Sequence, residues 1–266
     1  MSRRQYRAIL ADLDGTMNRG RTLLPGARET YLELSSRGIS WIFLSNNATK
    51  LAADLAEGIS RLGLAVSEDQ ILNSALALIH GVRTERPGAR VLVVGEAKLV
   101  NGLVNAGVAI TEDPEQADIV VAAMDRQFTY DKLKRAQAAL LRGALFWATN
   151  TDAALPVEDG LLPGAGSIVA AIGTAAGRAP DRVFGKPSPD MAYLALGLLG
   201  LPAESCLVVG DRMETDILFA RNAGMDSALV LTGATSRDAL EDFSYAPDHI
   251  LESIADLPSL FYSEAD

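Results

Sequence analysis

Residues 8–16 of the chain read AILADLDGT, and this stretch decides the fold prediction. An apolar run at residues 8–11 is followed at once by two aspartates, Asp12 and Asp14, and then by Gly15. A short apolar run that ends in a polar, glycine-containing turn is typical of a buried strand. In open α/β sheets, ligands bind just beyond the carboxyl ends of such strands. The stretch therefore predicts a strand with a functional turn at its end.

The same arrangement recurs later in the chain. Residues 39–44 and 206–209 also read as buried strands, and polar residues such as Ser45 and Asp211 follow them closely. Segments with helical spacing of apolar residues, such as residues 51–62, separate the strands. This alternation predicts an α/β fold with a doubly wound parallel sheet.

The middle of the chain carries additional apolar runs of its own, at residues 91–94, 119–122 and 145–148. One sheet that held every predicted strand would be unusually wide. We therefore predict a core that is interrupted by an inserted α/β cap domain. The predicted boundaries are residues 1–79 and 166–266 for the core and residues 80–165 for the cap.

The composition narrows the class of protein. The 266 residues are 48% hydrophobic and 22% charged, which is ordinary for a packed globular protein. With 24 Lys and Arg against 34 Asp and Glu, the formal net charge of −10 argues against nucleic acid or an anionic membrane as the main partner. The single Cys206 excludes a disulfide framework, and no targeting segment is visible, so we expect a cytoplasmic protein.

The histidines and the cysteine are expected to be structural. With His80 and His249 as the only histidines, the common zinc sites cannot be assembled. His80 lies in an apolar segment and is expected in the core or at its boundary. Cys206 lies inside a predicted strand and is expected to be a small buried apolar residue.

The two aspartates at the end of the first strand suit phosphoryl chemistry. Carboxylates two residues apart at a strand-to-turn junction can converge on one small volume. Mg²⁺ prefers one or two carboxylates together with phosphate oxygens and water. One carboxylate can also serve as nucleophile while the other serves as general acid and base.

With this turn and three later motifs, the sequence resembles the haloacid dehalogenase-like (HAD) superfamily of aspartate-nucleophile phosphotransferases. The motifs occur in the family's order: Asp12–Thr16 (DLDGT), Ser45 (in LSNN), Lys186 (in GKP) and Asp211–Asp216 (in GDRMETD). Further strings resemble its NagD-like, 4-nitrophenylphosphatase-like branch: 45–47 (SNN), 125–130 (DRQFTY), 148–152 (ATNTD), 163–167 (PGAGS) and 185–189 (GKPSP). One departure is Asn18, which stands where an aromatic residue is common in that branch.

The resemblance implies a Mg²⁺-dependent phosphatase of small phosphate monoesters. A sugar phosphate would be a substrate typical of that branch. Asp12 would be the nucleophile that forms an aspartyl-phosphate, and Asp14 the general acid and base. Mg²⁺ would be held by Asp12, by Asp211 and by the backbone carbonyl of Asp14, while Asp216 would act without touching the ion. The transferring phosphoryl group would be bound by Ser45, Asn46, Asn47 and Lys186.

The inserted domain would correspond to the large C2-type cap and would select the leaving group. The candidates for that selection are Asp125, Arg126 and Asp152, although the two aspartates could equally cap turns beside strand ends. The branch also contains cap-mediated homodimers. Two alternatives stay open: a phosphomutase on the same fold, and a non-catalytic phosphate- or metal-binding module. A nucleotide-cofactor enzyme has little support, because no G-x-G-x-x-G follows the first strand.

Overall fold

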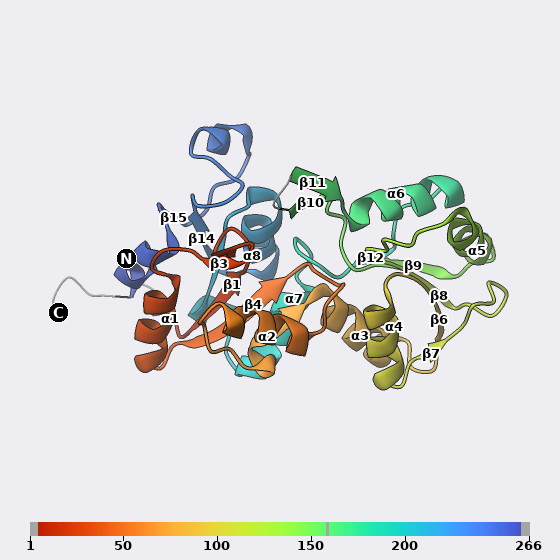
Figure 1. The fold of residues 1–266 in the computed structure, drawn as a ribbon, viewed down its shortest axis with the longest axis horizontal. Helices are drawn as coiled ribbons and strands as arrows, with labels where there is room; N and C mark the ends of the chain where they lie inside the picture. The colour runs from red at the N-terminus through yellow and green to blue at the C-terminus, as the bar shows by residue number, and fades with distance from the viewer. Residues whose placement is uncertain (1–4, 158–159, 262–266) are drawn as a thin grey trace. The chain divides into compact units, whose positions relative to one another are not determined.

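The computed structural model describes residues 5–157 and 160–261. The remaining residues, which the predicted core and cap include, lie outside the description. The chain folds into two compact units, which are described separately (Figure 1). The first unit takes the described residues up to Ser45, Ala53–Leu72 and those from Lys186 onward, and the second takes Asn46–Ala52 and Asn73–Gly185.

A six-stranded sheet forms the centre of the first unit. Its strands are, in spatial order, β15 (His249–Leu251), β14 (Asp226–Val230), β13 (Cys206–Gly210), β1 (Ala8–Asp12), β4 (Ser40–Ser45) and β5 (Ile71–Asn73). From β15 to β4 the neighbouring strands pair in parallel. Residues 8–11 and 206–210 are buried throughout, because helices cover both faces of a doubly wound sheet.

The connections of this sheet run in two directions from its centre. The chain passes from β1 through α1 (Ala27–Ser36) to β4, and then through α2 (Ala52–Arg61) toward β5. From β13 it passes in the opposite direction through α8 (Leu218–Ala223) to β14. Since such crossovers are right-handed, α1 and α2 lie on one face of the sheet and α8 lies on the other.

Shorter elements complete the first unit. They are the hairpin β2 (Asn18–Arg19) and β3 (Thr22–Leu23), helix α7 (Asp190–Leu199), the 3₁₀ helices η1 (Glu68–Gln70), η2 (Ala203–Ser205), η4 (Asp238–Asp242) and η5 (Ile254–Leu260), and the π-helical turn η3 (Met213–Ile217). The hairpin follows the DLDGT turn directly, and η3 follows Asp211. Both therefore belong to the segments that shape the carboxyl edge of the sheet.

The second unit has its own parallel sheet, with strand order β12 (Arg182–Val183), β9 (Leu145–Ala148), β8 (Ile119–Ala122), β6 (Arg90–Val94) and β7 (Ala109–Ile110). Helices α5 (Tyr130–Leu141) and α6 (Ala165–Ala176) pack on one face of it, and α3 (Ser74–Glu85) and α4 (Ala97–Asn105) on the other (Figure 1). A separate hairpin joins β10 (Ala154–Val157) to β11 (Gly160–Pro163).

The α/β class and the parallel sheets predicted from the sequence are confirmed. The bounds of the second unit differ from the predicted insertion of residues 80–165, since α3 and α6 both belong to it. Their apolar faces pack in that unit, and α6 contributes Ile168 and Ile172 to its buried cluster. The inserted unit thus extends on both sides beyond the apolar runs from which it was predicted.

Two predictions about single residues have different outcomes. Cys206 is fully buried at 0% exposure, as predicted. His80 is exposed, and its assignment to the core or boundary is wrong. On α3 the buried stripe contains Leu78 and Val82, whereas His80 shares the outer face with the exposed Arg83, three residues further on.

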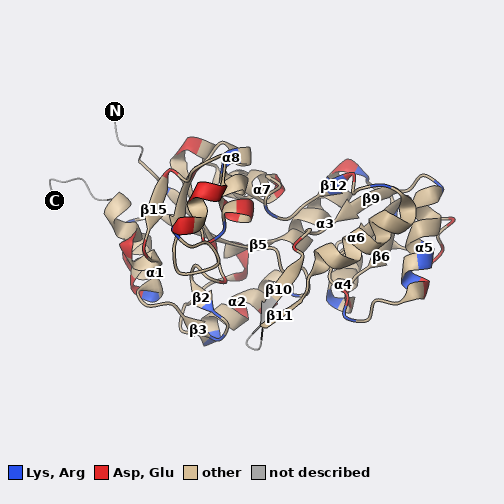
Figure 2. Cartoon of the chain, turned by 90° about the horizontal axis from the view of Figure 1, so that it is seen from above, with Lys and Arg blue, Asp and Glu red and all other residues tan. Residues whose placement is uncertain are grey.

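Charged residues of both signs are interspersed along the described ribbon of both units (Figure 2). None of the helices in the described part of the chain combines the length and the apolar character that crossing a membrane requires.

Candidate active site

The centre of the first sheet is a topological switch point. Strands β1 and β13 are neighbours, and the chain leaves them in opposite directions. Asp12 is the last residue of β1, Asp211 directly follows β13, and Ser45 is the last residue of the neighbouring β4. Because these strands are parallel, their carboxyl ends meet at one edge, where the diverging loops leave room for a ligand.

Three aspartates converge at this edge. Carboxylate oxygens of Asp12, Asp211 and Asp216 all lie within 4.8 Å of one another. Asp211 is 3% exposed and Asp216 is 1% exposed. Asp12 is half-buried, and three carboxylates at this distance repel one another, so positive charge must be supplied to the cluster.

Lys186 supplies part of that charge. Its Nζ lies 2.5 Å from Oδ1 of Asp12 and 2.6 Å from Oδ1 of Asp216, and the lysine is 3% exposed. Oδ2 of Asp216 also accepts a hydrogen bond of 3.1 Å from the backbone N–H of Arg212. Both oxygens of Asp216 are therefore engaged, which suits a residue that holds Lys186 in place.

The pKa values in the cluster follow from burial and mutual charge. Burial raises the pKa of Asp12 well above its usual range; Lys186 opposes that shift, and Asp216 and Asp211 add to it. Burial, with a further contribution from Asp216, raises the pKa of Asp211 to about 6. For Lys186, burial alone would lower the pKa, but Asp12 and Asp216 outweigh it and raise the pKa. Without another cation, the three carboxylates carry more negative charge than the Lys186 ammonium can balance.

Small residues make room for the Asp211 carboxylate. Gly15 has a φ of +92°, and a Cβ on it would lie 2.5 Å from Oδ2 of Asp211. A Cβ on Gly233 would lie 1.9 Å from the same oxygen. The backbone N–H of Ala234 donates to that oxygen over 2.6 Å. Ala234 thus holds the Asp211 carboxylate at a position that leaves no room for a side chain on Gly15 or Gly233.

Asp14 lies outside the cluster of three aspartates and is exposed. Its Oδ1 accepts a hydrogen bond of 2.8 Å from Nδ2 of Asn18. The turn between them is closed by the backbone N–H of Gly15, which donates to the carbonyl of Asn18 over 2.7 Å. Ser45, the other predicted core residue, is 8% exposed at the end of β4.

The next predicted residues belong to the second unit. Asn46 Nδ2 donates to Oδ2 of Asp152 over 3.0 Å, and Asn150 Nδ2 donates to the same oxygen over 2.7 Å. Oδ1 of Asn47 accepts from the backbone and the hydroxyl of Thr49, over 2.9 and 2.7 Å. Asp152 is thus tied to Asn46, the residue that follows Ser45 in the chain.

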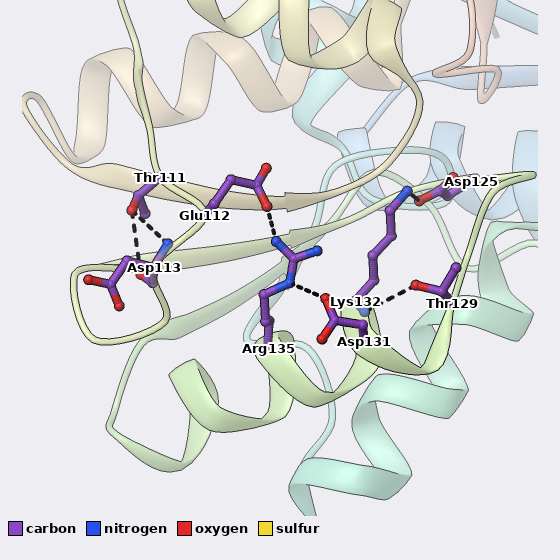
Figure 3. A network of polar contacts seen from close by, with 8 residues as sticks. All are labelled: Thr111, Glu112, Asp113, Asp125, Thr129, Asp131, Lys132 and Arg135. Atoms are coloured by element: carbon purple, nitrogen blue, oxygen red, sulfur yellow. Dashed lines mark hydrogen bonds and ion pairs between the residues drawn. The ribbon is translucent and has the colours of Figure 1, made fainter.

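Asp125 and Arg126 lie beside a pocket of about 410 Å³ in the second unit, which is also lined by apolar side chains such as Met124, Phe128 and Ile168. Asp125 is 4% exposed, and its Oδ2 lies 2.6 Å from Nζ of Lys132 on α5 (Figure 3). Arg126 pairs with Glu96 over 2.6 Å and has a side chain that is 53% exposed. Arg126 is thus the more accessible of the two charged side chains.

Sequence reasoning did not find two parts of the site. The first is Asn18, which was noted only as a departure from the family pattern. The second is the loop of residues 232–235, where the Thr232 hydroxyl donates to the carbonyl of Gly15 over 2.7 Å and Ala234 binds Asp211. Its small residues (TGAT) directly follow the apolar run at residues 228–231, and that position was the available signal.

Comparison with known families gives matches at both ends of the chain. A family model described as haloacid dehalogenase-like hydrolase matches residues 9–109, and one described as HAD-hydrolase-like matches residues 183–257. An acid sugar phosphatase from Staphylococcus aureus is 35% identical over 258 residues, which cover 96% of this chain and 99% of that protein.

Solved structures of phosphatases also align with nearly the whole chain. A p-nitrophenyl phosphatase from Archaeoglobus fulgidus aligns with a TM-score of 0.90 and 35% identity, over 96% of this chain and 99% of that one. A glycerol phosphate phosphatase from Mycobacterium tuberculosis, solved in complex with magnesium, aligns with a TM-score of 0.88 and 36% identity, over 95% of this chain and 76% of that one.

Proposed function

Since the chain belongs to the haloacid dehalogenase-like hydrolases, in the NagD-like branch, and is a phosphoric monoester hydrolase, we propose that it cleaves small phosphate monoesters through an aspartyl-phosphate on Asp12. Sugar phosphates and related alkyl phosphates are the proposed substrates. The observation that carries the proposal is the buried cluster of Asp12, Lys186, Asp211 and Asp216 at the switch point of the sheet.

Asp12 is the proposed nucleophile. Lys186 holds Oδ1 of Asp12, and this contact leaves Oδ2 as the oxygen that we assign to the attack on phosphorus. The Asp12 Oδ2–phosphorus bond forms as the bond from phosphorus to the ester oxygen breaks. Asp14 donates a proton to that leaving oxygen, and in the second half it accepts a proton from the water that attacks the aspartyl-phosphate.

The phosphoryl group requires donors around its equatorial oxygens during transfer. Ser45 offers a hydroxyl, Asn46 and Asn47 offer side-chain amides, and Lys186 offers an ammonium. Ser45 ends β4, a direct neighbour of the strand that carries Asp12, and this position supports its assignment. The assignment of the two asparagines rests on their position directly after Ser45.

The residues present fit a divalent cation. The cluster offers hard carboxylate oxygens within 4.8 Å of one another. Burial, together with the repulsion among the aspartates, raises the pKa values of Asp12 and Asp211, and a bound cation would favour their ionised forms. We propose that Asp12, Asp211 and the backbone carbonyl of Asp14 hold Mg²⁺, with Asp216 positioning Lys186. Bound Mg²⁺ supplies the positive charge that lets an anionic nucleophile approach an anionic ester.

The second unit is proposed to select the leaving group. Arg126 is the strongest candidate, because its side chain is more than half exposed and it lines an otherwise largely apolar pocket. Asp125 and Asp152 are engaged in contacts within their own unit, so they would act on selection by fixing neighbouring residues. Substitution of Arg126 by Ala should therefore change the ranking of substrates, whereas Lys186→Ala should depress all of them alike.

Phosphate release from a panel of alkyl, sugar and aryl phosphates, with Mg²⁺ and with excess chelator, tests the proposal. We expect release of inorganic phosphate with Mg²⁺ and loss of activity with chelator. Full activity in chelator would contradict the metal assignment. A phosphomutase would instead return the phosphoryl group to a second hydroxyl without net phosphate release.

A further inference from the structure

The carboxylate of Asp14 has little packing around it. Asp14 is exposed, so an unrestrained side chain would sample several rotamers. The structure instead ties Oδ1 to Nδ2 of Asn18, over 2.8 Å. Asn18 is 7% exposed, so a buried amide holds an exposed acid.

Asn18 is itself fixed by several contacts. Its backbone N–H donates to the carbonyl of Leu13 over 3.0 Å, and its carbonyl accepts from the N–H of Gly15 over 2.7 Å. It begins β2 and pairs with Leu23 of β3. Nδ2 also donates to the carbonyl of Gly20 over 3.2 Å. Since both partners of Nδ2 are acceptors, the orientation of the amide is determined.

We propose that Asn18 is a positioning residue for Asp14, an inference that rests on the general acid–base role proposed for Asp14. A carboxyl group that transfers a proton through one oxygen keeps the other oxygen as an acceptor in both protonation states. Asn18 occupies Oδ1 in both states. The proton is thereby confined to Oδ2, which gives it to the leaving ester oxygen and regains one from the attacking water.

The dependence on leaving group separates this role from a structural one. An alkyl ester needs its leaving oxygen protonated, whereas 4-nitrophenolate leaves readily without a proton. Poor positioning of the acid should therefore reduce kcat/KM for an alkyl phosphate more than for 4-nitrophenyl phosphate. A general loosening of the hairpin should reduce kcat/KM for both esters by the same factor.

The experiment compares kcat/KM for glycerol phosphate and 4-nitrophenyl phosphate in Asn18→Leu, Asn18→Asp, Asp14→Asn and Arg19→Ala. Asn18→Asp preserves the shape of the side chain, so it covers the case in which Asn18→Leu does not fold. Arg19→Ala is the matched control, because Arg19 ties the same hairpin to the carbonyl of Thr232 over 2.5 Å without touching Asp14.

We expect both Asn18 variants to lose at least about tenfold more kcat/KM with the alkyl ester than with the aryl ester. In Asp14→Asn the difference between the losses of kcat/KM with the two esters should be larger still, and in Arg19→Ala the two losses should be equal. Suppose that the Asn18 variants lose kcat/KM by the same factor with both esters, while Asp14→Asn loses more with the alkyl ester. That result would overturn the positioning role of Asn18 and leave the proposed role of Asp14 intact. Equal losses in Asp14→Asn would overturn the proposed role of Asp14 itself, and the inference with it.

Discussion

Gly15 is the residue on which the geometry of the acidic cluster depends most closely. Its φ of +92° is a conformation that side chains with a Cβ rarely adopt, and a Cβ there would meet Asp211 Oδ2 at 2.5 Å. Gly15→Ala should therefore displace Asp211 and reduce kcat by about 10²-fold or more. Steady-state kinetics with 4-nitrophenyl phosphate measure this loss.

Gly20→Ala is the matched control, since Gly20 also has a positive φ, of +56°, but a Cβ there meets nothing within 4 Å. It should cost about 1 kcal/mol in stability while kcat changes little. If Gly15→Ala kept the activity of Gly20→Ala, close packing around Asp211 would not matter for turnover.

Some single residues could be placed from the sequence and others could not. Asp12, Lys186, Asp211 and Asp216 were all singled out, because each follows a recognisable strand or motif, and the structure brings their side chains together. The hydrogen bond from Asn18 to Asp14 depends on how a tight turn folds back. The spacing of apolar residues along the sequence carries no information about that turn. His80 was misplaced because neighbours along a helix point in different directions.

The contact between Asp125 and helix α5 is the clearest test of what stabilises the second unit. Lys132, in the first turn of α5, reaches Asp125, whose side chain is 2% exposed (Figure 3). The other oxygen of Asp125 accepts from the backbone N–H of Gln127 over 2.9 Å. Lys132→Ala should therefore leave a buried carboxylate without its cation and destabilise the unit by about 2–3 kcal/mol.

Urea unfolding can follow the second unit by itself. In a Trp41→Phe background, Trp147 is the remaining tryptophan and reports that unit. The control is Arg142→Ala, because Arg142 and Glu115 form a pair with side chains 57% and 66% exposed, and such pairs contribute about 0–1 kcal/mol. Equal shifts in the two variants would show that the Asp125 pair is no stronger than a surface pair.

Buried strands of four residues were predictable, and strands of two residues were not. Residues 119–122 and 145–148 were predicted as strands and form β8 and β9 with those bounds. The two-residue strands β2, β3, β7 and β12 carry too little pattern for alternation to be recognised. They form because the segments beside them bring their backbones together.

For the chain as a whole, the buried carboxylate of Asp211 lowers the stability of the folded protein at neutral pH. The pKa of Asp211 is about 6 in the folded protein, above the ordinary value of 3.8, so the folded state binds its proton more tightly. This contribution favours folding below about pH 4 and is lost as the pH rises to about 6. At pH 7 the ionised group therefore costs the metal-free protein up to a few kcal/mol.

Two measurements follow from that cost. In a Trp147→Phe background that leaves Trp41 as the reporter, metal-free Asp211→Asn should unfold at a higher temperature than its parent at pH 7. The difference in Tm between Asp211→Asn and its parent should become smaller as the pH falls from 6 to 4. Mg²⁺ should raise the Tm of the parent more than that of Asp211→Asn, since an ion stabilises the state that binds it. Equal responses to Mg²⁺ would contradict the assignment of Asp211 to the cation.

Trapping of the phosphorylated enzyme tests the role of Asp12 most directly. Acid quench during turnover of a good substrate, followed by borohydride reduction and peptide mass spectrometry, converts a phosphorylated aspartate to homoserine at its position in the sequence. We predict homoserine at position 12 in the parent and none in Asp12→Asn, whose kcat should fall by about 10³-fold or more. Reduction at another residue, or Asp12→Asn turnover within about tenfold of the parent, would contradict Asp12 as the nucleophile.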